Sequence, residues 1–352
     1  MKKEKITKRQ HYIQRAYLCE WTDNKTNEGF LFAHRKSENK TFPTSLMGVG
    51  QEAYFYEMKR LSEVELVYCI LCGKSNIDII MKNKPYFYLE MNQAIWRLED
   101  KIINISKQKK IDLIKKEINN IQKQLGEEIQ SKHEGRNIIY IKNIINGDYS
   151  FYKDDDKRVE FLFYLAMQYV RTKNIRESLI TNFKKIDEFI DKIKANIVPV
   201  AEFAKIHNVN INVEMAKEQI KDTAVNFNLE KTMVYNSLSA ANELAHGLIV
   251  ANKMSLGVLQ TPDELKFITG DQPIINLKLH ERDEKGNILD MEFYYPLSPQ
   301  VAILLKKDKE PTVYNKTLSS DEVDYYNNFI FDNSYEQVYA SSEVELLTLC
   351  NR

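Results

Sequence analysis

The 352-residue chain is poor in residues that interrupt or cross-link a fold, with 11 glycines, 8 prolines and 4 cysteines. So few glycines and prolines predict long helices and few elaborate loops. Two of the cysteines, Cys69 and Cys72, have CxxC spacing, but they lie in the apolar stretch VELVYCILC and no second CxxC accompanies them. This setting favours buried core thiols over a redox or metal role, and it predicts a reducing, cytoplasmic compartment.

Net charge and long apolar runs are also missing. Fifty basic residues balance fifty acidic ones, which excludes a whole-chain electrostatic footprint for nucleic acid or anionic membrane but leaves a local patch open. Because no run of about 18 apolar residues occurs, we expect no membrane span. The basic start MKKEKITKRQ leads into His11 and Tyr12, so we expect no signal peptide.

Hydrophobic residues make up 43% of the chain, and their spacing predicts an α+β fold. Strand patterns occur at Gly29–Ala33, at Val209–Val213 and repeatedly after Gly257. Helical patterns fill the middle, where Ser62 and Glu65 resemble a capping box, and a helix over Met215–Met254 ends in small and amide residues. We therefore predict one domain over residues 1–352, with a helical middle region packed on a small mixed or antiparallel sheet formed by the N- and C-terminal segments.

A helical arm is predicted at about residues 95–130, in two apolar series whose phase slips at Gln108–Lys110. The slip indicates either a stuttered coiled coil or two helices that meet in a hairpin. Through the 95–125 helices the arm either contacts a protein partner or contacts a second copy of the chain. Alternatively, it packs as an amphipathic helix on the main body. The two series are Ile95, Leu98, Ile102 and Ile105, and then Ile111, Ile114, Ile118, Ile121 and Leu125.

A carboxylate stands on a break between two apolar runs in FITGDQPIINL, residues 267–277. Phe267-Ile268 and Ile274-Ile275 have the pattern of buried strand. Gly270 tolerates a positive φ and Pro273 donates no ladder hydrogen bond, so we expect the backbone to turn or bulge there. Such a break at a strand end is a common place for a functional side chain, here Asp271.

An arginine lies within a predicted helix over Val159–Ile180. Gln168 and Arg171 share one face of this helix, and the turns before them are apolar nearly all round. A guanidinium so placed needs a compensating group. Arg171 therefore either holds a phosphate or carboxylate ligand, or forms an internal ion pair with an acidic residue such as Asp271.

Four motifs, taken in order, resemble a known family. They are HYIQRAYL from His11, QYVRTKNIR from Gln168, FITGDQPI from Phe267 and YPLSP from Tyr295, and together they resemble the domain-of-unknown-function family 4238 over roughly residues 8–342. The region Lys107–Ser150 looks like an insertion. The residues that match the family motifs are His11, Arg171, Arg176 and Asp271, whereas Gln14, Arg15, Lys173 and Gly270 depart from them.

The resemblance implies a shared fold and a polar pocket, and it suggests a role in microbial (anti-phage) defence. The expected catalytic residues are His11, Asp271, Arg171 and Arg176, and the expected substrate-binding residues are Tyr12, Gln168, Thr269 and Gln272. In this interpretation His11 and Asp271 form an acid–base pair and the arginines stabilise negative charge. We assign no metal ligand, although a divalent metal remains open.

Such a set suits a hydrolase or nuclease-like enzyme that acts on nucleic acid or nucleotides. Three other interpretations stay open. In one, His11, Tyr12 and Asp271 form a buried hydrogen-bond network that joins the chain ends. In another, the protein is a non-catalytic module that senses an anion or nucleotide, or binds a partner. In the third, it is a purely structural subunit of a multi-protein system.

Overall fold

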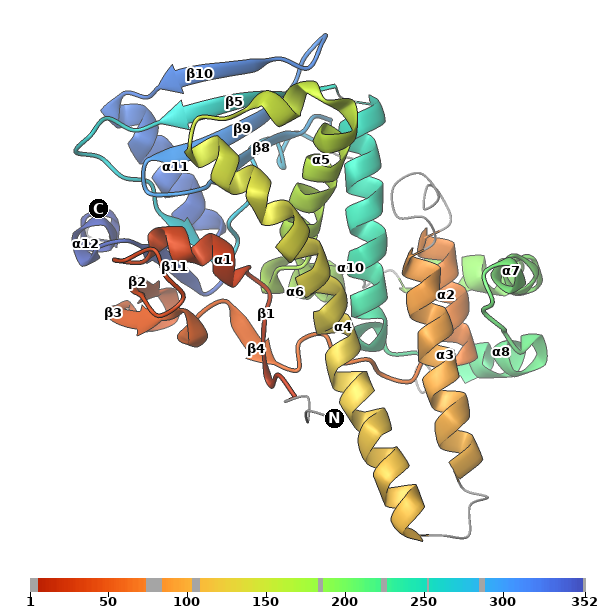
Figure 1. Ribbon diagram of the computed structural model, residues 1–352. Coiled ribbons are helices and arrows are strands. Elements are labelled where there is room, and N and C mark those ends of the chain that lie inside the picture. The colour runs from red at the N-terminus through yellow and green to blue at the C-terminus, as the bar shows by residue number, and fades with distance from the viewer. Residues whose placement is uncertain are drawn as a thin grey trace. The chain divides into compact units, whose positions relative to one another are not determined.

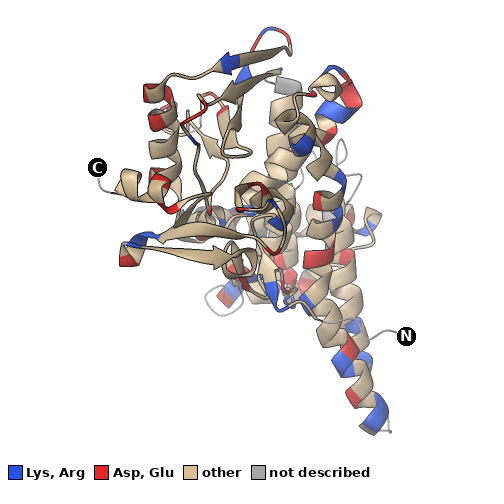
Figure 2. Ribbon diagram, turned by 60° about the vertical axis from the view of Figure 1, so that its left-hand side comes forward, with Lys and Arg blue, Asp and Glu red and all other residues tan. Residues whose placement is uncertain are grey.

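The computed structural model describes residues 6–73, 84–102, 108–182, 186–222, 227–251, 253–284 and 289–350 (Figure 1). The chain divides into two compact units. We call the first the helical unit, formed by Met1–Gln10, Ala53–Lys132 and Arg176–Glu243. The second, the mixed unit, is formed by His11–Glu52, His133–Ile175 and Leu244–Arg352. Charges of both signs are scattered over the ribbon of each unit (Figure 2).

Helices make up the helical unit, and its first long one begins as expected. The Ser62 hydroxyl accepts from the Glu65 backbone N–H at 3.2 Å, and the Glu65 carboxylate accepts from the Ser62 N–H at 2.7 Å, so the predicted capping box is confirmed. Glu65 is fully buried and also accepts from the Asn228 N–H at 2.7 Å. The helices of this unit are α2 (Glu63–Gly73), α3 (Lys84–Ile102), the first part of α4 (Gln108–Ile145), α6 (Lys173–Asn182), α7 (Ile186–Ile206), α8 (Val213–Gln219), η6 (Ile220–Asp222) and α10 (Leu229–His246).

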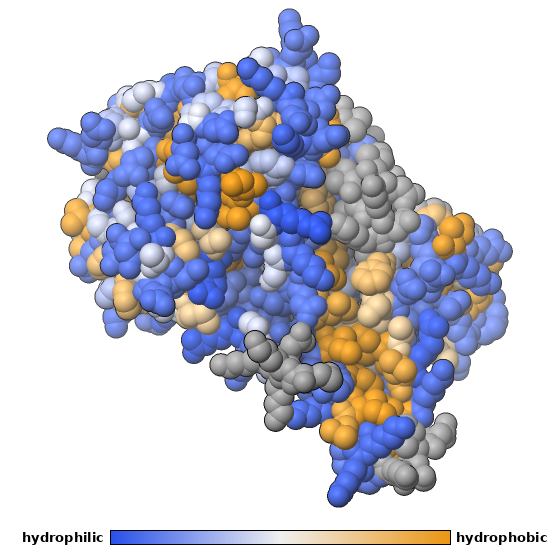
Figure 3. Space-filling view, viewed as in Figure 1, coloured by the Kyte–Doolittle hydropathy of each residue, from blue (hydrophilic) through white to orange (hydrophobic). Residues whose placement is uncertain are grey.

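The predicted arm consists of two separate helices, α3 and α4, and residues 103–107 between them lie outside the described residues. Ile118 is buried, whereas Leu98, Leu113 and Ile121 are 55%, 64% and 41% exposed. Figure 3 shows an apolar area over α3 and α4. The arm thus buries part of its apolar series and leaves part of it at the surface.

Two expectations for the middle of the chain are wrong. Residues 209–212 form no strand; they lead into α8, whose first turn is capped by the Asn212 side chain, which accepts from the Met215 N–H at 3.1 Å. The predicted helix over Met215–Met254 ends at Gln219, and a new helix, α10, begins at Leu229. The Asn212 side chain favours the start of a helix over a strand here, because its carbonyl oxygen accepts from a helical N–H that has no backbone partner.

The mixed unit confirms the α+β class, with strands in more than one sheet. A four-stranded sheet has the order β3-β2-β11-β6, so strands from both ends of the chain pair as expected. A five-stranded sheet has the order β10-β5-β9-β8-β7, and only β10 with β5 is parallel in it. The strands of the first sheet are β2 (Phe30–Arg35), β3 (Lys40–Ser45), β6 (Thr269–Gly270) and β11 (Gln337–Ala340).

The five-stranded sheet is built wholly from C-terminal strands. Its central strand β9 is buried over its first five residues, as is β5 over its first six, which places the core between this sheet and helix α5. The strands are β5 (Met254–Gln260), β7 (Ile275–Asn276), β8 (Glu292–Pro296), β9 (Val301–Lys307) and β10 (Val313–Thr317). A separate two-stranded sheet pairs β1 (Arg9–His11) with β4 (Gln51–Ala53).

Short helices and two longer ones complete the mixed unit. Helix α11 begins with a capping box of Ser319 and Glu322. It ends where the Lys36 ammonium donates to the carbonyls of Phe331 and Ser334, both at 2.8 Å. A lysine at a helix C-terminus satisfies carbonyls that have no helical partner. These elements are α1 (Arg15–Leu18), η1 (Cys19–Trp21), η2 (Lys36–Glu38), η3 (Leu46–Gly48), η4 (Ser150–Lys153), α5 (Asp155–Val170), η7 (Gly247–Ala251), α11 (Ser320–Asn333) and α12 (Glu343–Cys350).

Candidate functional site

Three of the four sequence motifs meet at the hydroxyl of Tyr17 in the mixed unit. Tyr17 is fully buried; its hydroxyl donates to the Pro296 carbonyl at 2.7 Å and lies 2.6 Å from Thr269 Oγ1. Because the single phenolic proton goes to Pro296, Thr269 must be the donor in the second bond. Burial raises the pKa of Tyr17 well above its ordinary value. Thr269, predicted to bind substrate, therefore holds its own motif to the first one.

Arg171 forms an ion pair with Glu134 of α4. The Arg171 side chain is fully buried, whereas that of Glu134 is 19% exposed. Gln14 extends the cluster, because its amide donates to the Glu134 carbonyl at 3.2 Å and accepts from the Tyr164 hydroxyl. The interpretation of an internal ion pair thus holds with a different acid from the expected Asp271. Glu134 was overlooked because it lies in a stretch that resembles an insertion.

Asp271 is occupied by backbone N–H groups at the start of β11. Its Oδ1 accepts from Tyr335 at 2.7 Å, and its Oδ2 accepts from Glu336 at 2.6 Å and from Gln337 at 2.9 Å. Burial raises the pKa of Asp271 to about 6, and the three hydrogen bonds oppose that rise. The Asp271 N–H in turn donates to the Gln337 carbonyl at 3.0 Å. At this point the chain passes from β6 of the four-stranded sheet to β7 of the five-stranded sheet. The Asp271 carboxylate therefore holds this connection to β11.

Gly270 is required by crowding rather than by its backbone conformation. A Cβ at this position would lie 2.0 Å from Ser334 Oγ, and the φ of Gly270 is not positive. The expected reason for the glycine was therefore wrong. The strand also begins later than predicted, because β6 is Thr269–Gly270 and not Phe267-Ile268.

His11 and Tyr12 hold the loop around η3. The His11 Nε2 donates to the Leu46 carbonyl at 3.1 Å, and the Tyr12 N–H donates to the Gly50 carbonyl at 2.9 Å. Burial raises the pKa of Tyr339, and the charges of Tyr12 and Asp271 add to that rise. The N- and C-terminal parts of the chain are joined by backbone pairing, because β11 pairs with both β2 and β6.

The remaining predicted residues are buried or bonded to other parts of the protein. Thr172 donates to the Gln272 carbonyl oxygen, and the Gln272 amide donates to the Ile274 carbonyl at 2.8 Å. Gln168 is 4% exposed. Arg176 belongs to the helical unit, where it donates to the Phe55 carbonyl at 3.5 Å and lies 4.8 Å from the Phe55 ring centroid.

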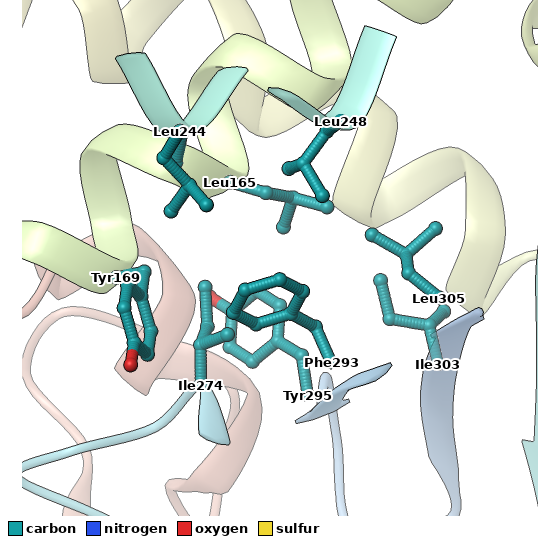
Figure 4. Close-up of a pocket in the computed structure, with 10 residues that line it drawn as sticks. Leu165, Tyr169, Leu244, Leu248, Ile274, Phe293, Tyr295, Ile303 and Leu305 are labelled. Atoms are coloured by element: carbon teal, nitrogen blue, oxygen red, sulfur yellow. The ribbon is translucent and has the colours of Figure 1, made fainter. Parts of the chain in front are cut away.

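A small apolar cavity lies beside the cluster in the mixed unit (Figure 4). Its volume of about 10 Å³, measured for the centre of a water-sized sphere, is close to the least that holds one water molecule. Helix α5 forms one wall, and strands β8 and β9 form another. The lining residues are Leu165, Ala166, Tyr169, Leu244, Leu248, Ile274, Phe293, Tyr295, Ile303 and Leu305. This space is too small and too apolar for a polar substrate.

The helical unit contains a much larger pocket, with a volume of about 180 Å³ by the same measure. It is formed by α2, α6 and α10, and most of its wall comes from a single face of α10, at helical spacing. We call it the α10 pocket. It is lined by Tyr68 and Cys72 of α2, Leu179 of α6, and Leu229, Met233, Asn236, Ser239, Ala240 and Glu243 of α10.

Two polar atoms in the wall of the α10 pocket have no hydrogen-bond partner among the residues that the structure describes. They are Asn236 Oδ1 and Ser239 Oγ, whose residues are 9% and 3% exposed. Leaving a buried acceptor or hydroxyl unsatisfied costs about 1–3 kcal/mol each. Cys72 lies nearby as a free thiol, and burial raises its pKa to about 11, so it is neutral at pH 7. Sequence reasoning noted the small and amide residues of this helix but assigned them no role.

In the described ranges, no group of three or more His, Cys, Asp or Glu side chains is placed to hold a metal ion. Within these ranges there is also no helix with the length and apolar character needed to cross a membrane.

Comparison with known proteins places the chain in one family. Residues 9–344 match the family described as "Protein of unknown function (DUF4238)", and because this match covers nearly the whole chain, the protein belongs to that family. The expected resemblance is confirmed. No curated protein and no solved structure matches the chain.

Proposed function

We propose that this DUF4238 protein is a non-catalytic binding module that senses a small ligand in the α10 pocket. The observation that carries the proposal is the pair of buried, unpartnered polar atoms, Asn236 Oδ1 and Ser239 Oγ, in the wall of a 180 Å³ pocket. Pockets of this kind, largely apolar with a few placed polar groups and formed between helices, are the usual sites for small ligands.

The residues of the sequence motifs also support a non-catalytic function. The carboxylate of Asp271 already accepts three backbone N–H groups, and the guanidinium of Arg171 is already paired with Glu134. A catalytic base or an anion-binding arginine needs capacity left for substrate. These residues instead stabilise the crossover and the helix end that build the mixed unit.

Binding is tested with the full-length protein and a library of single-ring fragments, observed by ligand-detected NMR. We expect a subset of fragments to bind the wild type and to lose binding in Ala240→Phe. Ala240 lines the pocket and is half-buried, so the larger side chain fills the space. Leu98→Phe, at an exposed position of α3, is the matched control and should keep the binding. A library with no binder that depends on Ala240 contradicts the proposal.

Hydrolase activity is the competing function, and a second assay addresses it. The protein is incubated with RNA, DNA and nucleoside triphosphates, with and without Mg²⁺ or Mn²⁺. We expect no turnover. Turnover that disappears in Asp271→Asn while the variant keeps its circular dichroism spectrum would establish the enzyme instead.

A further inference from the structure

The α10 pocket also has a chemical preference, which the two unmatched polar atoms in its wall define. This inference rests on the proposed function and adds the class of ligand. We infer that the pocket takes a neutral carboxamide or lactam attached to one apolar ring. The ligand N–H donates to Asn236 Oδ1, and the ligand carbonyl accepts from the Ser239 hydroxyl.

Size sets the first limit. A cavity of about 150 Å³ lined by apolar side chains binds benzene, so the 180 Å³ of the α10 pocket suits one ring with a short substituent. A nucleotide carries a base, a sugar and phosphate, and exceeds this space. The size of the pocket therefore favours a single-ring ligand over the nucleotide that the sequence suggested.

The orientation of the Asn236 amide sets the second limit. The Thr232 hydroxyl donates its only proton to the Leu229 carbonyl at 2.7 Å, so it can only accept from Asn236 Nδ2, which lies at 2.8 Å. Nδ2 also donates to the Tyr68 hydroxyl oxygen at 3.5 Å, so both of its protons are directed at the protein. Oδ1 remains as an acceptor in the pocket wall, and an acceptor requires a donor on the ligand.

The Ser239 hydroxyl sets the third limit. Ser239 follows Asn236 by three residues on the same face of α10, and residues so spaced have Cβ atoms about 5–6 Å apart. Its hydroxyl has a proton to donate and no acceptor for it among the described residues. A ligand that satisfies both atoms therefore needs a donor and an acceptor side by side. A carboxamide or lactam has both, because its N–H and its carbonyl belong to one planar group.

Charge sets the fourth limit, because the two unmatched atoms belong to neutral side chains. The Cys72 thiol in the same wall is also neutral at pH 7, since burial raises its pKa to about 11. Glu243 lines the pocket but already interacts with another group of the chain, so we assign it no ligand. A charged ligand group beside Asn236 and Ser239 would lose its hydration without gaining an opposite charge. The pocket therefore disfavours ammonium and carboxylate ligands.

Calorimetric titration of the full-length wild type at pH 7 tests the preference without any variant. The probes are benzamide, acetophenone, which has a methyl group in place of the amide nitrogen, and benzylamine, which is an ammonium at this pH. We expect saturable binding of benzamide. The other two should bind at least about tenfold more weakly, because acetophenone leaves Oδ1 without a donor and benzylamine buries an unpaired charge.

Two outcomes contradict the inference. Acetophenone or benzylamine that binds as tightly as benzamide overturns it but leaves the proposed function intact. If none of the three probes binds, the inference also fails, and the fragment library decides the proposed function separately.

Variants assign the two hydrogen bonds. Asn236→Leu removes the acceptor, so it should weaken benzamide about tenfold and leave acetophenone unchanged. Ser239→Ala removes the donor, so it should weaken both probes, because both carry a carbonyl. Ser237→Ala, at a half-buried serine of α10 outside the described pocket lining, is the matched control and should change neither. Benzamide affinity that is equal in Asn236→Leu, Ser239→Ala and wild type contradicts the assigned hydrogen bonds.

Discussion

The mixed unit and the helical unit differ in the partners of the buried polar side chains discussed above. In the mixed unit, Tyr17 and Asp271 are buried and hydrogen-bonded to groups of the protein itself, and Arg171 is buried and forms an ion pair with Glu134. In the helical unit, Asn236 Oδ1 and Ser239 Oγ are buried beside empty space and remain unmatched. Polar groups matched internally stabilise a fold, whereas unmatched groups at a pocket favour a ligand.

The largest expected effect breaks the internal pairing of the mixed unit. Arg171→Met leaves the Glu134 carboxylate without its guanidinium, and removing one partner of a buried ion pair costs about 3–5 kcal/mol. Urea unfolding of the full chain measures the loss. In a double-mutant cycle with Glu134→Gln we expect a coupling energy well above that of an exposed pair such as Arg35 with Glu38. Additive effects would mean that the pair contributes nothing.

The pH dependence of stability isolates Asp271. Its pKa rises from 3.8 to about 6 on folding, so the folded state binds the proton more tightly than the unfolded state does. The stability that this group contributes is therefore full below about pH 4 and is lost as the pH rises through 6, by ~3 kcal/mol. The difference in unfolding free energy between wild type and Asp271→Asn should shrink by about 2 kcal/mol from pH 4 to pH 7. A difference that is constant over this range contradicts the raised pKa.

A smaller effect is expected at the hydroxyl that joins three motifs. Tyr17→Phe leaves the buried Pro296 carbonyl and the Thr269 hydroxyl without this partner, which should lower the unfolding free energy by about 1–3 kcal/mol. The same change at Tyr325, which is 51% exposed, should stay within about 0.5 kcal/mol. Equal effects at the two positions would show that the cluster does not stabilise the unit.

The smallest expected effect is an increase in stability, and it tests the unmatched hydroxyl of the helical unit directly. Ser239→Ala removes a buried hydroxyl that has no partner, and alanine favours a helix more than serine does. We expect the unfolding free energy to rise by ~0.5–1 kcal/mol. Thermal unfolding in the absence of any added small molecule measures it. Destabilisation by this change would mean that the hydroxyl is satisfied within the folded protein.

Sequence reasoning was most successful where the determinants are local. The capping box of Ser62 and Glu65 needs only residues three apart, and the break after Asp271 is predicted by Pro273, which donates no ladder hydrogen bond. It was least successful where a partner lies far along the chain. Glu134 meets Arg171 across 37 positions, and the three N–H groups that bind Asp271 lie more than 60 residues further on. No local pattern reveals such pairs.

The sequence by itself determined the α+β class, the family, and the residues that need a buried partner, because composition, periodicity and motif order depend on the chain alone. The tertiary structure decided which partners they have: Glu134 for Arg171, and backbone N–H groups for Asp271. It also left Asn236 Oδ1 and Ser239 Oγ buried at a pocket with no hydrogen-bond partner among the described residues. The physical reason is that hydrogen bonds and ion pairs act over a few ångströms, and only folding determines which distant residues come that close.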